Sequence, residues 1–264
     1  MLLCVDVGNS STVLGLFDAD TLVRHWRVST SENRTSDEWH LLVDGLLRPL
    51  GADLDGIAVC STVPVVLQEI REMLRTHHGD RSCLIVEPGV RTGVPVQMDN
   101  PREVGTDRIL NALAAIRLHG APCIVVDFGT ATTYDVVSPR GEYVGGAIAP
   151  GIGLSLEALG RAGAQLRRVE LLRPRSVVAK NTVEALQSGA VFGFAGQVEG
   201  LVTRMIDELG LVRDDVTVVA TGGLAAVVVE ECAVIDVHDP WLTLHGLRLA
   251  YARNGGNLTA SAPG

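Results

Sequence analysis

The stretch LLCVDVGNSST at residues 2–12 decides the fold, because IVVDFGTATT at residues 124–133 repeats its pattern half a chain later. Each stretch is an apolar strand that ends in Asp-x-Gly and continues directly into small hydroxyl residues. Two further strand-like runs follow each copy. A strand, a glycine turn and more strands, occurring twice, indicate an internal duplication of the kind that holds phosphates between two similar domains.

Hydrophobic periodicity predicts the same order of elements in both halves. In the first half we expect a helix that Ser36 caps and whose apolar stripe runs to Leu47. The other predicted elements there are strands at 2–7, 13–17, 25–28, 56–60 and 83–86 and helices at 65–75 and 106–118. In the second half they are strands at 123–127, 133–137, 143–148, 216–220 and 233–237 and helices at 155–166, 182–209, 224–231 and 242–253. We interpret each half as βββαβαβα, with the two helices at 155–166 and 182–209 standing at the place of the first helix in the second half.

The boundary between the halves is expected where residues 119–122, His-Gly-Ala-Pro, end a helix. The predicted domains are residues 1–118 and 119–253, with an interdomain cleft in which a ligand is expected to bind. The small and polar residues 254–264 are expected to form a disordered tail.

Composition excludes several classes of protein. A formal net charge of −9 argues against nucleic-acid binding as the main role. No apolar run approaches the roughly 20 residues that span a bilayer, and we predict no signal peptide, which favours a cytoplasmic protein. The five cysteines lack CxxC spacing and are interpreted as buried, reduced thiols.

Lys180 is the only lysine in the chain, and no GxxxxGK[ST] motif occurs. A P-loop kinase is therefore excluded. Any phosphate must be held by backbone N–H groups, hydroxyls, arginine or a metal ion.

The first loop has the chemistry of a phosphate site. Gly8 and Asn9 readily adopt positive φ and would close a tight turn whose N–H groups form an anion nest. Hydroxyls follow at Ser10, Ser11 and Thr12, and Asp6 could hold Mg²⁺. An ordinary polar β-hairpin turn is the alternative.

The second loop, residues 127–133, offers the same chemistry at the matching place in the repeat, so the two loops together favour a phosphate clamp. The turn at 221–223, Thr-Gly-Gly, would let backbone approach a flat ligand such as adenine, or is a plain strand–helix turn. The glycine-rich run at 145–151 indicates close backbone packing.

Two further positions remain open on sequence alone. Asp107, at the start of a helix, could compensate the helix dipole or accept a proton from a substrate hydroxyl, with Arg108 pairing an anionic group. Thr182 follows a helix N-cap at Asn181 with Glu184 as capping partner, which explains it without any substrate.

Taken in order, these motifs resemble those of type III pantothenate kinases, bacterial enzymes of the acetate and sugar kinase, heat-shock chaperone and actin superfamily. The resemblance covers about residues 1–253. The motifs that carry it stand at residues 6–9, 99–108, 126–133, 145–151, 180–184 and 220–223.

The resemblance implies an α/β fold of two actin-like (ribonuclease H-like) domains. It also implies ATP-dependent phosphorylation of pantothenate to 4'-phosphopantothenate, the first step of coenzyme A biosynthesis. Family members are cytoplasmic homodimers. Their partners are pantothenate and ATP, and neither nucleic acid nor a membrane is expected to bind.

The resemblance also assigns residues. Asp107 matches the family's proton acceptor, and Asp127 matches the ligand of an activating monovalent cation, K⁺ or NH₄⁺. Asp6 is the expected Mg²⁺ ligand. The expected substrate contacts are Gly105, Thr106, Asp107, Arg108 and Thr182. The expected ATP contacts are Asp6, Val7, Gly8, Asn9, Ser10, Ser11, Thr12, Val13 and Thr130.

Some positions depart from the family pattern. Met98 stands where a tyrosine often contacts substrate, Thr106 replaces the usual alanine, and Asn9-Ser10-Ser11 varies the first loop. Two alternatives follow: a kinase of the same superfamily acting on another hydroxyl substrate, or a degenerate nucleotide-binding or regulatory relative. Residues 183–209 could form a dimer interface or a buried core helix.

Overall fold

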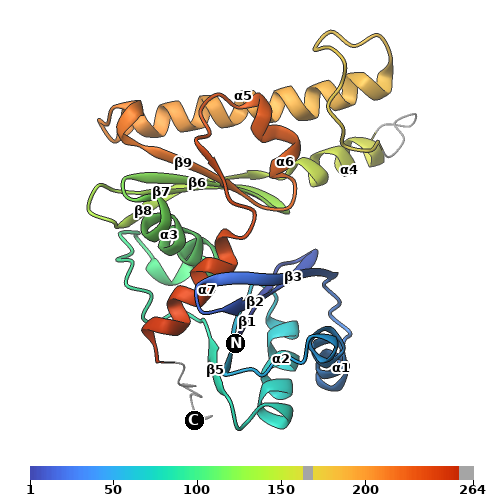
Figure 1. Ribbon diagram of the computed structural model, residues 1–264. Helices are drawn as coiled ribbons and strands as arrows, with labels where there is room; N and C mark the ends of the chain where they lie inside the picture. Colours follow the sequence, from blue (N-terminus) through green and yellow to red (C-terminus); the bar gives the residue numbers. More distant parts are fainter. Residues whose placement is uncertain (163–168, 256–264) are drawn as a thin grey trace. The chain divides into compact units, whose positions relative to one another are not determined.

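The computed structural model describes residues 1–162 and 169–255 (Figure 1). Its described residues form two compact units. The first comprises Met1–Gly93, Asn100–Ala114 and the chain from Thr243 on, and the second comprises Val94–Asp99 and Ala115–Leu242. Within the described residues, no helix has the length and apolar character needed to cross a membrane.

The first unit is built on a five-stranded sheet in the order β3-β2-β1-β4-β5. β1 (Leu2–Val7) lies antiparallel to β2 (Ser11–Asp18) and parallel to β4 (Gly56–Ser61). The outer strands are β3 (Thr21–Ser29) and β5 (Ser82–Ile85). Side chains alternate along a strand, so Leu3, Val5 and Val7 share one face of the sheet.

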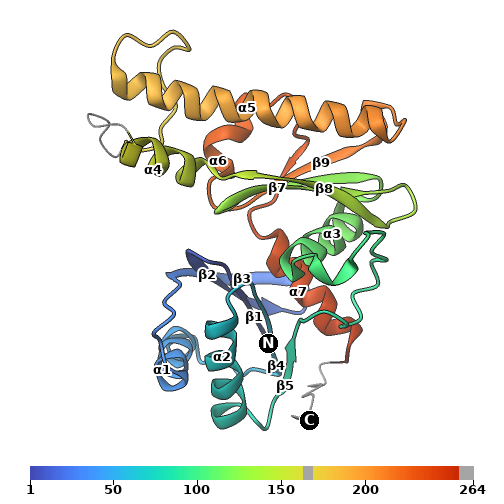
Figure 2. The same ribbon diagram turned by 180° about the vertical axis from the view of Figure 1, so that it is seen from behind.

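That face packs against α1 (Ser36–Leu47) and α2 (Pro64–His77), which lie side by side in Figures 1 and 2. Trp39, Val43 and Ile70 contribute buried side chains to this core. The apolar stripe predicted for the first helix is therefore confirmed. Its cap is different: the Thr35 side chain accepts from the Glu38 N–H, and Ser36 lies inside the helix.

On the opposite face of the same sheet, glycines allow the C-terminal helix to pack closely. A Cβ on Gly15 of β2 would lie 2.7 Å from Leu244 of α7 (Leu242–Arg253), and one on Gly246 would collide with the carbonyl of Leu110 of α3 (Thr106–His119). The C-terminal helix thus packs on the first sheet, although it follows the second half in sequence. The division at residues 118 and 119 stays a prediction.

The second unit repeats the topology of the first. Its sheet has the order β10-β9-β6-β7-β8, which matches β5-β4-β1-β2-β3 strand for strand. The bounds are β6 (Cys123–Phe128), β7 (Ala131–Val137), β8 (Tyr143–Pro150), β9 (Thr217–Thr221) and β10 (Val237–His238). This repeat confirms the predicted duplication of one α/β unit.

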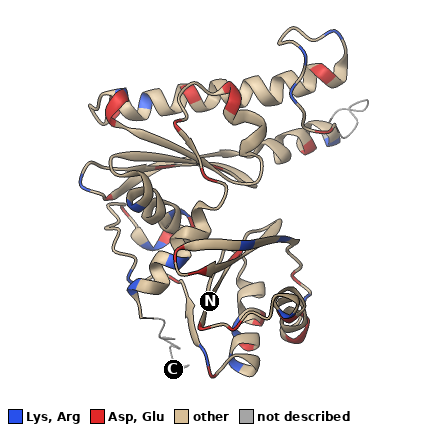
Figure 3. Cartoon of the chain, viewed as in Figure 1, with Lys and Arg blue, Asp and Glu red and all other residues tan. Residues whose placement is uncertain are grey.

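In the described part of the chain, the helices that accompany the second sheet are α4 (Ile152–Ala162), α5 (Thr182–Glu208) and α6 (Ala225–Val228). α5 runs along one face of the sheet in both ribbon views (Figures 1 and 2), where Val198, Val202 and Ile206 join the core beneath it. Charged residues lie mainly on helices and connecting loops (Figure 3). Short 3₁₀ turns stand at 48–50, 101–103, 213–215 and 229–231.

Most predicted elements agree with the structure to within a few residues. The strand expected at 233–237 is wrong, because only Val237 and His238 pair, and they pair with β9. Part of the helix expected at 155–166 and most of the tail expected at 254–264 lie outside the described residues. Asn254 is described and its side chain donates to the Ala250 carbonyl of α7. The five cysteines are buried and free, as predicted.

Candidate active site

The first loop is a hairpin turn between β1 and β2. Hydrogen bonds within the turn and from Thr30, the residue after β3, hold its backbone. The Gly8 N–H donates to the Ser11 carbonyl at 3.1 Å, and the Thr30 N–H donates to the Ser10 carbonyl at 3.2 Å. The Thr30 hydroxyl donates to the Gly8 carbonyl at 2.7 Å. Asn9 and Ser10 are exposed. The turn therefore has one face held by β3 and another open to solvent.

Neither Gly8 nor Asn9 has a positive φ, so the predicted backbone reason for these residues is wrong. The reason for glycine at position 8 is steric, because a Cβ there would lie 3.1 Å from the Ser11 carbonyl oxygen. Thr12 differs from its neighbours because it is fully buried, with its hydroxyl 2.9 Å from that of Thr30.

Asp6 ends the inner strand β1, with Val13 of β2 and Cys60 of β4 as its neighbours in register. The Cys60 thiol donates to Asp6 Oδ1 at 3.3 Å. Burial, and then the charge of Asp107, raise the pKa of Asp6 to about 7, while Cys60 and Arg27 oppose the shift. Asp6 and Asp107, both in the first unit, are thus close enough to influence each other.

Asp107 lies in the first turn of α3, after Gly105 and Thr106 and before Arg108, all of which are half-buried. Burial raises the pKa of Asp107, although the backbone amide of Arg108 opposes this. A carboxylate that only compensated a helix dipole would have a lowered pKa. The shift comes from burial, and the role of Asp107 as proton acceptor stays a prediction.

Gly105 controls the space beside Asp107. A Cβ added at Gly105 would collide with Asp107 Oδ1. The main chain therefore runs against the carboxylate, and no larger residue fits without displacing it. The sequence motif marked this glycine but gave no reason for it.

The second loop gathers residues from three places in the sequence. Asp127 lies at the end of β6, and Gly222, at a φ of +94°, passes so close that a Cβ there would collide with Asp127 Oδ1. The Gly151 N–H donates to the Thr130 carbonyl at 3.1 Å. Thr130 itself is exposed. The glycine-rich runs at 145–151 and 221–223 therefore pack on the Asp127–Thr130 turn.

Thr182 lies at the exposed start of α5. Asn181 caps this helix by accepting the Glu184 N–H at 2.9 Å, which confirms the predicted cap. The Glu184 carboxylate binds the Asn181 amide at 2.7 Å and the Arg175 guanidinium at 2.5 and 2.8 Å. The local hydrogen bonds explain the cap fully and leave the predicted substrate contact of Thr182 as a prediction.

Met98 lies beside the start of β8. The Gln97 N–H donates to the Tyr143 carbonyl at 2.8 Å, which holds this segment along the strand. A Cβ on Gly145 would lie 3.7 Å from the Met98 sulfur. Met98 is 37% exposed, so a thioether meets solvent where relatives are expected to carry a tyrosine hydroxyl.

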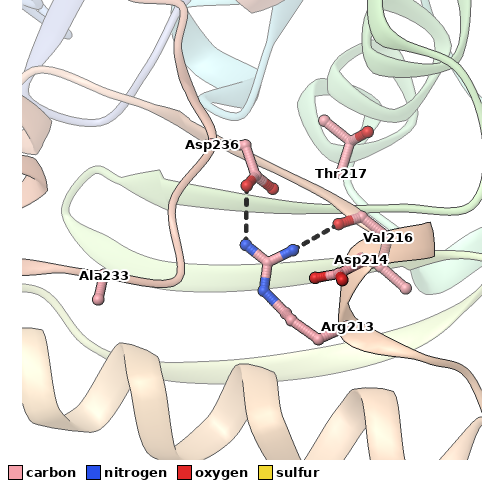
Figure 4. Close-up of a pocket in the computed structure, with 6 residues that line it drawn as sticks. All are labelled: Arg213, Asp214, Val216, Thr217, Ala233 and Asp236. Carbon is pink, nitrogen blue, oxygen red and sulfur yellow. Dashed lines mark hydrogen bonds and ion pairs between the residues drawn. The ribbon is translucent and has the colours of Figure 1, made fainter.

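A pocket of about 470 Å³ lies elsewhere on the second unit, lined by Arg213, Asp214, Val216, Thr217, Ala233 and Asp236 (Figure 4). The Arg213 guanidinium already makes hydrogen bonds in this pocket: it donates to the Val216 carbonyl at 2.7 Å and to the Asp236 carboxylate at 2.8 Å. Thr217 begins β9, whereas Thr221, which pairs with Asp127, ends it. About 13 Å of strand separates the two, so the pocket is distinct from the second loop.

Metal binding would rely on few protein ligands. Within the described ranges, no group of three or more His, Cys, Asp or Glu side chains could hold a metal ion. Asp6 and Asp127 each offer carboxylate oxygens, the ligands that hard cations prefer. Mg²⁺ commonly takes one or two carboxylates and completes its shell with water and substrate phosphates.

The site includes residues that the sequence did not single out. Thr30 braces the first loop, Thr62 donates its N–H to the Val7 carbonyl at 3.0 Å, and Cys60 binds Asp6. Threonines and cysteines next to strands are common. The pairing of β2 with β3 brings Thr30 to the loop, and the pairing of β1 with β4 brings Cys60 and Thr62.

Comparison with solved structures agrees with the fold. ROK hexokinase from Thermus thermophilus has a TM-score of 0.53 at 16% identity, covering 96% of this chain and 99% of that one. The activator of 2-hydroxyisocaproyl-CoA dehydratase from Clostridium difficile has a TM-score of 0.53 at 13% identity, covering 99% of both chains. These likenesses confirm the predicted duplicated actin-like fold.

Comparison of sequences finds relatives that are far more similar to this chain than the solved structures are. The sequence profile of type III pantothenate kinases matches residues 2–204. The type III pantothenate kinase of Thermobifida fusca is 63% identical over 257 residues, covering 96% of this chain and all of that one. That of Streptomyces griseus is 62% identical over 261 residues, covering 96% of this chain and 98% of that one. The chain therefore belongs to the type III pantothenate kinase family.

Proposed function

We propose that the chain transfers the terminal phosphoryl group of ATP to the primary hydroxyl of pantothenate, forming 4'-phosphopantothenate in the first step of coenzyme A biosynthesis. Asp107 acts as the general base. The observation that carries this assignment is the half-buried carboxylate of Asp107, held against Gly105 with a raised pKa, in a chain of this family. A base with a pKa nearer the working pH contributes roughly 10²–10⁴-fold to the rate.

The remaining groups position the reactants, because phosphoryl transfer needs orientation and charge neutralisation more than covalent help. The open face of the first loop supplies N–H groups and hydroxyls for ATP phosphates, and exposed Thr130 supplies another hydroxyl. Gly105, Thr106, Arg108 and Thr182 contact pantothenate. The family assignment supports these roles, together with the exposed or half-buried positions of the residues.

Asp6 binds Mg²⁺, which neutralises phosphate charge when bound, and Asp127 binds K⁺ or NH₄⁺. The support for Asp127 is its setting: the backbone of Gly222 approaches its carboxylate, and the carbonyls of Gly129 and Thr130 lie nearby against Gly151. Carboxylate and carbonyl oxygens suit a hard cation.

The enzyme acts as a cytoplasmic homodimer. Apolar side chains are exposed at the start of α5 and in the segment before it: Val177 is 64% exposed, Val178 80% and Val183 51%. The face of α5 farther along is buried in its own unit. The interface therefore uses the start of α5 instead of its whole length, which sedimentation of a Val178→Asp variant would test.

The test is ADP release with ATP, Mg²⁺ and pantothenate, in K⁺ against Na⁺. Turnover that depends on pantothenate and on K⁺ is expected. A panel of other hydroxylated substrates run in parallel separates this activity from the alternative of a different substrate. Turnover with a sugar and none with pantothenate would overturn the proposal.

Asp107→Asn is expected to lower kcat about 10²-fold or more while ATP binding persists, because the amide cannot accept the substrate proton. The matched control is Asp37→Asn, which removes a first-turn carboxylate from α1. Steady-state kinetics and calorimetry with an ATP analogue measure both. Near-normal turnover of Asp107→Asn would refute the role of this residue.

A further inference from the structure

Cys60 of β4 lies directly opposite Asp6 of the neighbouring parallel strand β1. Only 1% of the residue is exposed, and its thiol donates to Asp6 Oδ1 at 3.3 Å. The contact is therefore a directed S–H···O hydrogen bond to a carboxylate.

The surroundings of Asp6 favour a hydrogen-bond donor next to its carboxylate. Asp6 shares its part of the unit with Asp107, a second carboxylate, and the charge of Arg27 opposes the resulting repulsion. A carboxylate in such a place needs a hydrogen bond to keep one rotamer. Ala58, two residues earlier on the same face of β4, is also fully buried, so this face accommodates a side chain without sulfur.

We propose that Cys60 is a positioning residue for phosphoryl transfer: its thiol holds Asp6 Oδ1 and thereby orients Oδ2 toward the Mg²⁺–nucleotide. The inference rests on the proposed function, because it takes Asp6 as the Mg²⁺ ligand. Cys60 itself touches neither substrate nor metal. Its effect on the reaction passes through the orientation of Asp6.

Four variants test this role. Cys60→Ala removes the donor, Cys60→Val removes it while retaining bulk, and Cys60→Ser restores a donor. Cys4→Ala is the matched control, because Cys4 lies two residues before Asp6 on the same face of β1 and is equally buried. Thermal unfolding of each variant establishes that it is folded.

The measurements are the Mg²⁺ concentration for half-maximal rate, the KM for pantothenate, and calorimetric binding of Mg²⁺ with a non-hydrolysable ATP analogue. Loss of one hydrogen bond to a carboxylate should weaken Mg²⁺–nucleotide binding about 3–10-fold in Cys60→Ala and Cys60→Val. The pantothenate KM should stay unchanged. Cys60→Ser should recover binding to within about twofold, and Cys4→Ala should match the unmodified protein.

Wild-type Mg²⁺ dependence in both Cys60→Ala and Cys60→Val would overturn the inference, as would an equal effect of Cys4→Ala. Asp6→Asn separates this failure from failure of the proposed function. If Asp6→Asn binds Mg²⁺–nucleotide normally, Asp6 is not the ligand. If Asp6→Asn is impaired and Cys60→Ala is not, only the positioning role fails. In the Asp6→Asn background, Cys60→Ala should add no further loss.

Discussion

At the scale of single residues, the site depends on its glycines as much as on its functional side chains. Gly105 lies against Asp107, and Gly222 lies against Asp127, each at a distance that a Cβ would occupy. Only Gly222 of these two has a positive φ, so close approach is the reason for glycine at position 105. Both carboxylates are therefore held by main chain from one side.

Gly105→Ala should lower kcat about 10²-fold, because displacing a catalytic group by an ångström costs about that much. ATP-analogue binding should change little. Gly45→Ala is the control: Gly45 has nothing within 4 Å of its Cβ position in α1, and the alanine should raise stability by ~0.5–1 kcal/mol without altering kinetics. A Gly105→Ala enzyme with unchanged kcat would show that Asp107 tolerates movement.

At the scale of elements, three histidines join α1 and α2. The rings of His40 and His77 stack with centroids 3.9 Å apart, and His78 lies edge-on to His40 at 5.6 Å. Burial, and then the charge of Arg81, lower the pKa of His78 from 6.5 to about 4. Acid therefore charges this histidine more readily in the unfolded chain than in the folded one.

The consequence is a pH-dependent junction between α1 and α2. Between pH 6.5 and about 4 the unfolded state binds the extra proton, so the stabilisation is present above this window and is lost as pH falls through it. His78→Gln should flatten the pH dependence of the denaturation midpoint across the window relative to the unmodified protein. An identical pH dependence in both proteins would contradict the assignment to His78.

At the scale of the whole molecule, the first unit is closed by α7, the last helix among the described residues. α7 reaches the face of the first sheet opposite α1 and α2, where Gly15 and Gly56 leave room for Leu244 and Tyr251. Gly246 in turn admits the Leu110 carbonyl of α3. Residues far apart in the sequence therefore pack together within the first unit.

Gly246→Ala tests this closure. Alanine favours helices over glycine by about 1 kcal/mol, yet here its Cβ meets a main-chain oxygen that cannot rotate away. We expect a net destabilisation of about 1–3 kcal/mol, seen as a lower urea midpoint. Gly189→Ala in α5, where the Cβ position is open, should be neutral or stabilising. A midpoint for Gly246→Ala at or above that of the parent would refute the close contact.

The amino-acid sequence was sufficient to predict the order of elements, the two Asp-x-Gly loops, the cap at Asn181 and the family, because periodicity, turn residues and motif order are local properties of the chain. It missed the Thr35 cap, which lies one residue before the predicted one, and it overextended the strand at 233–237, where apolar residues do not pair.

The contacts that support the two loops could not be predicted in this way, because they come from the folding of the chain in three dimensions. The bond between Cys60 and Asp6 joins residues 54 positions apart, and it exists because β1 and β4 pair in one register. The brace from Thr30, the contact of Gly222 with Asp127 and the docking of α7 on the first sheet arise in the same way. Such contacts depend on which distant segments are brought together, and nothing in the neighbouring residues records that choice.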